Sequence, residues 1–147
     1  MANQRRIVPD VVSEQTLVAL TGNDHVRDAA RLMKHRRVGS VLVMDGDALE
    51  GIFTERDMVY RVVAEGLDPD LTPLSQVMTA NPDTIDAGAT ALDALRAMNE
   101  RGYRHLPVMD EGRVIGVVST RDFYGEEKAE EESRHAIDAG RVTQLRN

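Results

Sequence analysis

Two pairs of residues combine a hydroxyl with a carboxylate three positions later: Thr54 with Asp57, and Ser119 with Asp122. Each pair follows an apolar run and opens a predicted helix. In one interpretation the pair is a capping box, in which hydroxyl and carboxylate satisfy backbone N–H groups at the helix start. In the other it is a ligand site: the free N–H groups bind a phosphate, and the carboxylate accepts hydrogen bonds from the two hydroxyls of a ribose. The pattern alone leaves both interpretations open.

Both pairs belong to a longer internal repeat. Residues 25–57 align with residues 90–122 without a gap, and 11 of the 33 positions are identical. Average residue usage predicts roughly two. The identical positions include the Gly, Arg and Asp of each motif. The chain is therefore a duplication, and any account of its function has to explain a pair of units.

Basic side chains accompany the second pair. The run Arg104-His105-Leu106-Pro107 opens the strand expected beside Ser119, where two basic groups would face an anion; the alternative is a surface Arg and a hydrogen-bonded His. Arg121 is also within reach of a phosphate. The first unit has Gly39-Ser40 in place of the basic run, with Arg36-Arg37 just upstream. We therefore expect the first site to be empty or shaped for a different ligand.

Periodicity indicates the elements that position these motifs. Apolar residues at i, i+3, i+4 and i+7 predict helices over about 25–36 and, in the second unit, after a capping box of Thr90 and Asp93. Two hairpins follow, 41–44 with 49–53 and 106–109 with 114–118. Further helices are predicted over 55–65 and from about 120, and short strands over 16–20 and 83–85. Each unit thus reads strand–helix–strand–strand–helix, an α/β (α+β) class.

The predicted boundaries are 8–67 for the first unit, 68–73 for a linker and 74–125 for the second unit. Residues 1–7 are predicted to be a loose arm. Residues 126–147 are predicted to be an acidic, polar tail, either a solvated helix or a partly disordered segment.

Composition narrows the function classes. The net charge of −7 argues against binding to nucleic acid, which needs a basic surface. Cysteine is absent and no apolar run approaches the length of a membrane span, so we expect a cytoplasmic protein without membrane contact. The four histidines lack metal-ligand spacing. No nucleophile, base and orienting group are arranged together, so we expect neither a metal site, a required cofactor nor a catalytic residue.

The duplicated chain contains three characteristic segments in this order: PLSQVMTANPDTI, RHLPVMD and GVVSTRD. This combination resembles a tandem pair of CBS domains, a Bateman module, over roughly residues 8–125. The resemblance implies two β-α-β-β-α repeats packed with pseudo-twofold symmetry, their sheets face to face and ligand clefts between them. It also implies a role for Ser/Thr near a phosphate and for Asp on ribose hydroxyls.

For this sequence the resemblance implies two ligand sites. In each, backbone groups of a strand edge are expected to hydrogen-bond an adenine. The residues of the second-unit site are Thr84, Ile85, Arg104, His105, Leu106, Pro107, Ser119, Arg121 and Asp122. The residues of the less certain first-unit site are Ala19, Leu20, Arg37, Gly39, Ser40, Thr54, Arg56 and Asp57.

The function implied is a regulatory sensor that binds AMP, ADP or ATP, ahead of NAD(H), and transmits occupancy to a regulated protein. The basic residues favour a phosphate, which ranks S-adenosylmethionine lower. The alternative is a structural adaptor with vestigial clefts that contacts partners through its acidic tail. CBS modules also pair into discs, so we expect a homodimer formed through Val59, Val62, Val63 and Phe123.

Overall fold

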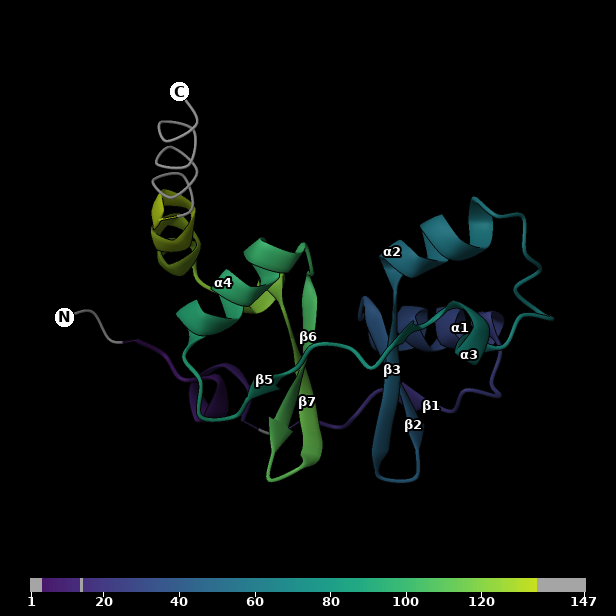
Figure 1. Cartoon of the computed structure of the whole chain (residues 1–147), viewed down its shortest axis with the longest axis horizontal. Helices are drawn as coiled ribbons and strands as arrows, with labels where there is room; N and C mark the ends of the chain where they lie inside the picture. The colour runs from purple at the N-terminus through teal and green to yellow at the C-terminus, as the bar shows by residue number, and fades with distance from the viewer. Residues whose placement is uncertain (1–3, 14, 135–147) are drawn as a thin grey trace.

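The computed structural model describes residues 4–13 and 15–134, and its two halves repeat one another (Figure 1). The first half contains β1 (Ala19–Leu20), α1 (Val26–Arg36), β2 (Ser40–Asp45), β3 (Ala48–Thr54) and α2 (Glu55–Asp57), which continues as the π-helical segment η2 (Met58–Val63). The second half contains α3 (Leu74–Val77), β4 (Thr79–Ala80), β5 (Ile85–Asp86), α4 (Ala91–Arg101), β6 (His105–Asp110), β7 (Arg113–Ser119) and the 3₁₀ turn η3 (Thr120–Asp122).

Each half is built on one mixed sheet. The first sheet has the strand order β1-β2-β3-β4 and the second β5-β6-β7. In both, a short strand runs parallel to the first arm of an antiparallel hairpin. The registers of the hairpins match: Leu42 pairs with Ile52 in one, and Pro107, at the equivalent position, pairs with Val117 in the other. The predicted class, hairpins and repeat are therefore confirmed.

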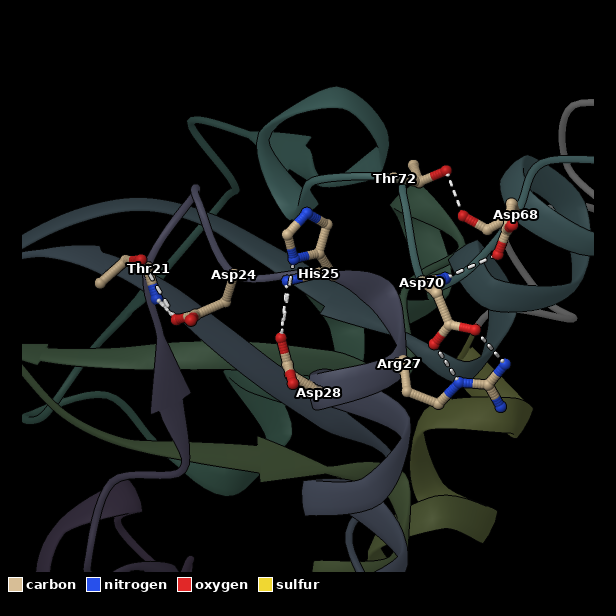
Figure 2. Close-up of polar contacts among 8 residues, drawn as sticks. All are labelled: Thr21, Asp24, His25, Arg27, Asp28, Asp68, Asp70 and Thr72. Atoms are coloured by element: carbon tan, nitrogen blue, oxygen red, sulfur yellow. Dashed lines mark hydrogen bonds and ion pairs between the residues drawn. The ribbon is translucent and has the colours of Figure 1, made fainter.

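The two long helices begin where the sequence predicts. Thr90 and Asp93 form the predicted capping box of α4: the Asp93 N–H donates to the Thr90 hydroxyl at 3.1 Å, and the Thr90 N–H donates to the Asp93 carboxylate at 3.0 Å. At α1 the His25 N–H donates to the Asp28 carboxylate at 2.9 Å (Figure 2). The stripe of α1 that includes Val26 is buried against its sheet, as the periodicity requires.

The segment between the repeats is held against the start of α1. Arg27 forms a forked ion pair with Asp70, its Nε and Nη2 lying 2.7 and 3.0 Å from the carboxylate oxygens (Figure 2). The Thr72 hydroxyl donates to the Asp68 carbonyl at 2.7 Å. Because the ion pair is half-exposed, it fixes the path of the segment more than it stabilises the fold.

Each repeat inserts its leading segment into the core of the other. The turn η1 (Ile7–Val11) precedes the first repeat, yet Ile7 is fully buried in the core of the second and its N–H donates to the Ala89 carbonyl at 2.8 Å. In Figure 1 this dark purple turn lies beside α4 and β5. Conversely, Leu74 and Val77 of α3 are buried in the core of the first repeat. The prediction of a loose N-terminal arm is therefore wrong for Ile7.

A third apolar cluster joins the two sheets. Leu42 and Ile52 of the first hairpin pack with Val114 of the second, and Leu17 and Val117 pack against them. The faces of the two sheets therefore meet, as predicted, and the cleft described below opens at one end of this contact.

The segments after the two motifs differ. α2 and η2 form one continuous helical run, and Gly66, with a left-handed φ of 68°, follows it. After η3 the chain is extended at Phe123, whose side chain is buried, and a helix restarts over residues 125–134. A single helix from about 120 was thus the wrong prediction, because Phe123 is drawn into the core of its own repeat.

The start of the predicted tail is docked onto the second repeat. Glu127 pairs with Arg5 at 2.8 Å, and Glu131 is only 3% exposed, 4.0 Å from Arg96. Within residues 126–134 the predicted tail is helical, and its Glu127 and Glu131 side chains contact Arg5 and Arg96. Residues 135–147 lie outside the described part of the chain.

Candidate functional site

A cleft of about 460 Å³ lies between the two repeats. The first repeat lines it with residues 15–18 and 36–40, and the second lines it with His105, Val117, Ser119, Arg121 and Asp122. The cleft thus unites residues from both predicted sites. Arg37, Gly39 and Ser40 come from the predicted first-unit set, and four others come from the second-unit set.

One wall of the cleft is a strand edge that is tied to the opposite repeat. The Gln15 side chain donates to the Val117 carbonyl at 3.2 Å and accepts from the Val117 N–H at 2.9 Å. Gly116 permits this approach, since an added Cβ would lie 2.6 Å from the Gln15 Oε1. The backbone groups of Thr16 and Leu17 form no hydrogen bond with other described residues, so this edge can hydrogen-bond a ligand.

The two motif carboxylates lie in different environments. Asp57 is only 7% exposed, accepts from the Thr54 N–H at 3.0 Å and from the Thr54 hydroxyl at 3.2 Å, and lies 3.5 Å from Arg61. Asp122 is exposed and accepts from the Ser119 N–H at 2.7 Å through Oδ2. Its Oδ1 has no hydrogen-bond partner among the described residues. Both pairs are therefore caps, but only Asp122 lines the cleft and keeps a carboxylate oxygen without a partner among the described residues.

Around the first motif, neighbouring side chains are engaged in polar contacts. Arg56 donates to the Gly102 carbonyl at 3.4 Å and lies 5.1 Å from the Tyr60 ring. Next to Gly102, Asp83 pairs with Arg101 at 2.9 Å and accepts from the Tyr103 hydroxyl at 2.8 Å. Thr54, Arg56 and Asp57 do not line the cleft.

His105 lines the cleft, and burial lowers its pKa while nearby Glu55 partly opposes that shift. An added Cβ at Gly39 would lie 2.5 Å from the Glu55 Oε1 and 3.1 Å from the His105 Nε2. Gly39 therefore lets these two side chains converge on the boundary between the repeats. Glu55 was not among the predicted site residues, although it directly follows Thr54.

Several predicted residues lie away from the cleft. Thr84 is exposed and Ile85 pairs with Val108 within β5, while Ala19 and Leu20 form β1. Leu106 and Pro107 are buried in β6, and exposed Arg104 accepts the Thr120 N–H at 3.1 Å through its carbonyl. The chain segment that lines the cleft with Asp122 is 16–18 of the first repeat, because Leu17 packs between the two sheets and Gln15 is hydrogen-bonded to Val117.

Comparison with known proteins agrees with this architecture. The family model for the CBS domain matches residues 5–64 and 74–127. The chain belongs to the CBS-domain family. Among the residues that the structure describes, there is no cluster of His, Asp or Glu suited to a metal ion, nor a helix long and apolar enough to cross a membrane.

Both CBS repeats have known relatives. CBS domain-containing protein CBSCBSPB2 of Arabidopsis thaliana is 43% identical over 68% of this chain, which spans only 19% of that longer protein. A putative signal-transduction protein with CBS domains from Burkholderia ambifaria is 37% identical, with a TM-score of 0.72 over 75% of this chain and 81% of that one. A CBS domain protein from Pyrobaculum aerophilum, solved in complex with AMP, is 25% identical, with a TM-score of 0.72 over 82% of this chain and 94% of that one.

Proposed function

We propose that this CBS pair is a regulatory module that binds one adenosine-containing nucleotide in the cleft between its repeats. The observation that carries the proposal is Asp122, which lines the cleft: its Oδ2 accepts the Ser119 N–H at 2.7 Å, and its Oδ1 has no hydrogen-bond partner among the described residues. A carboxylate held in this way suits the vicinal hydroxyls of a ribose.

The remaining walls suit the other parts of such a ligand. The unpaired backbone of Thr16 and Leu17 supports recognition of a flat base, and Val117 offers it an apolar surface. Arg37 and Arg121 support binding of phosphate. The AMP complex of the Pyrobaculum relative supports an adenine nucleotide, and AMP, ADP or ATP is proposed ahead of NAD(H) and S-adenosylmethionine.

The first-repeat motif is proposed to be structural. The Asp57 carboxylate already contacts Thr54 and Arg61. The Arg56 guanidinium already donates to the Gly102 carbonyl. One nucleotide should therefore bind per chain.

Isothermal titration calorimetry tests the proposal with AMP, ADP, ATP, NAD⁺, S-adenosylmethionine and 2′-deoxy-ADP. We expect a stoichiometry of one for a ribonucleotide and at least roughly tenfold weaker binding of the deoxy form, because one hydrogen bond to a charged group is lost. A structural adaptor with vestigial clefts predicts no heat with any of these ligands.

A homodimer is proposed through the exposed side of η2. Val59, Tyr60 and Val63 are more than half exposed there. Val62 and Phe123 were also predicted at this interface, but both are buried in the repeat cores and cannot contribute. A molar mass of one chain at all concentrations in multi-angle light scattering would contradict the dimer.

A further inference from the structure

The cleft continues into a second hollow, of about 360 Å³, that we call the basic pocket. It is lined by Met33, Lys34, Arg37, Val38, Glu55 and Arg121. Arg37, Val38 and Arg121 line the cleft as well, so the two spaces share a wall. A ligand seated at Asp122 can therefore extend past Arg121 and Arg37 toward Lys34.

The basic pocket has an excess of positive charge. Lys34, Arg37 and Arg121 outnumber the one acidic residue, Glu55. None of the three cations forms an ion pair with an acidic residue in the described part of the chain, although Arg27, Arg61 and Arg101 elsewhere do. Three cations gathered without carboxylate partners suit a ligand that carries more than one negative charge.

The backbone of Arg37 gives an independent reason to assign it a function. Arg37 ends α1 in the left-handed conformation, with φ 57°, whereas the second repeat has Gly102 at the same position with φ 78°. A side chain in this region is strained and glycine is not. A strained residue whose guanidinium lines both the cleft and the basic pocket is typical of a binding position.

We infer that the basic pocket holds the phosphates beyond the first of a nucleoside di- or triphosphate. This inference rests on the proposed function. It makes Lys34 and Arg37 the residues that distinguish ADP and ATP from AMP, with Arg121 contacting the phosphate chain between the ribose and the pocket.

Calorimetric titration of AMP, ADP and ATP into matched variants tests the inference. Lys34→Asn and Arg37→Gly each introduce the residue found at the equivalent position of the second repeat, Asn99 or Gly102. Arg31→Asn removes the same charge one helical turn away, outside both hollows. We expect the wild type to bind ADP and ATP at least tenfold tighter than AMP. Lys34→Asn should reduce that preference roughly tenfold, the loss expected for a hydrogen bond to a charged group, while Arg31→Asn leaves it unchanged.

Arg37→Gly separates a binding role from a structural one. Because glycine relieves the left-handed strain, the melting temperature should be unchanged or higher while the affinity for ADP and ATP falls. A lower melting temperature with unchanged affinity would overturn the role of Arg37. Equal wild-type affinity for AMP, ADP and ATP would overturn the inference and leave the proposed function standing. If no nucleotide binds and inorganic pyrophosphate is also not bound, both are contradicted.

Discussion

Gln15 and Val117 are joined by two hydrogen bonds, of 3.2 and 2.9 Å, across 102 residues of sequence. The amide side chain takes the place of a neighbouring strand for one residue of β7. It thereby holds the strand edge of the first repeat opposite the carboxylate of the second. Gln15 and Val117 both line the cleft, so this contact joins the two repeats within its wall.

Replacing Gln15 by Ala should therefore weaken nucleotide binding more than folding. Loss of its two partly exposed hydrogen bonds is expected to lower the free energy of unfolding by about 1–2 kcal/mol, while the released strand edge lowers affinity roughly tenfold. Urea denaturation and calorimetry measure the two effects. Gln76→Ala, at an exposed position outside the cleft, is the matched control. A loss of affinity in both variants would contradict this role of Gln15.

Ile7→Ala should destabilise the whole chain. Ile7 is fully buried in the core of the second repeat, so its truncation should cost about 2–5 kcal/mol. Val59→Ala removes an apolar side chain that is 52% exposed and should cost less than about 0.5 kcal/mol. Equal midpoints of denaturation for wild type and Ile7→Ala would show that the arm does not complete that core.

Asp57→Ala and Asp122→Ala should differ in stability. Asp57 is nearly buried and receives hydrogen bonds from both the N–H and the hydroxyl of Thr54, so its loss should cost about 2–3 kcal/mol. Asp122 is exposed and accepts one hydrogen bond, so its replacement should lower the free energy of unfolding by about 1 kcal/mol. Chemical denaturation of the apo proteins measures both. The reverse order would mean that the second motif, too, is chiefly structural.

His105 should make the stability of the apo protein depend on pH. Burial lowers its pKa in the folded state, so the unfolded chain takes up a proton first as the pH falls below about 6.5. Stability should therefore decrease from about pH 7 downward and level off below the folded pKa. His105→Asn should flatten this part of the curve, whereas His35→Asn, at an exposed position, should not. Identical slopes in all three proteins would exclude His105 as the cause.

Local patterns predicted the elements well because local forces decide them. The Thr90–Asp93 box and the two hairpins appear at the expected residues, since capping and turn preferences act within a few positions. The sequence pattern also offered a capping box as one interpretation of the two hydroxyl–carboxylate pairs. Both pairs are caps in the structure.

The composition of the cleft was harder to predict because it depends on how the repeats cross. Thr84 and Ile85 were assigned to the second site by resemblance to the family, but the segment that lines the cleft with that motif is Thr16–Val18. Which segment lies there depends on how the two sheets pack against each other, and this packing is long-range. The burial of Ile7 in the second repeat is a second long-range feature. A long-range exchange of segments leaves little trace in local sequence.

Binding of ADP to Asp122→Asn tests the central claim most directly. Asparagine keeps an oxygen that can accept the Ser119 N–H, so the cap and the apo melting temperature should be retained, while the charge facing the cleft is lost. Calorimetry should show one ADP per wild-type chain and at least tenfold weaker binding to Asp122→Asn, the loss expected when hydrogen bonds to a charged group are weakened. Equal affinity of the two proteins for ADP, at equal melting temperature, would contradict the assignment of Asp122 to the ribose.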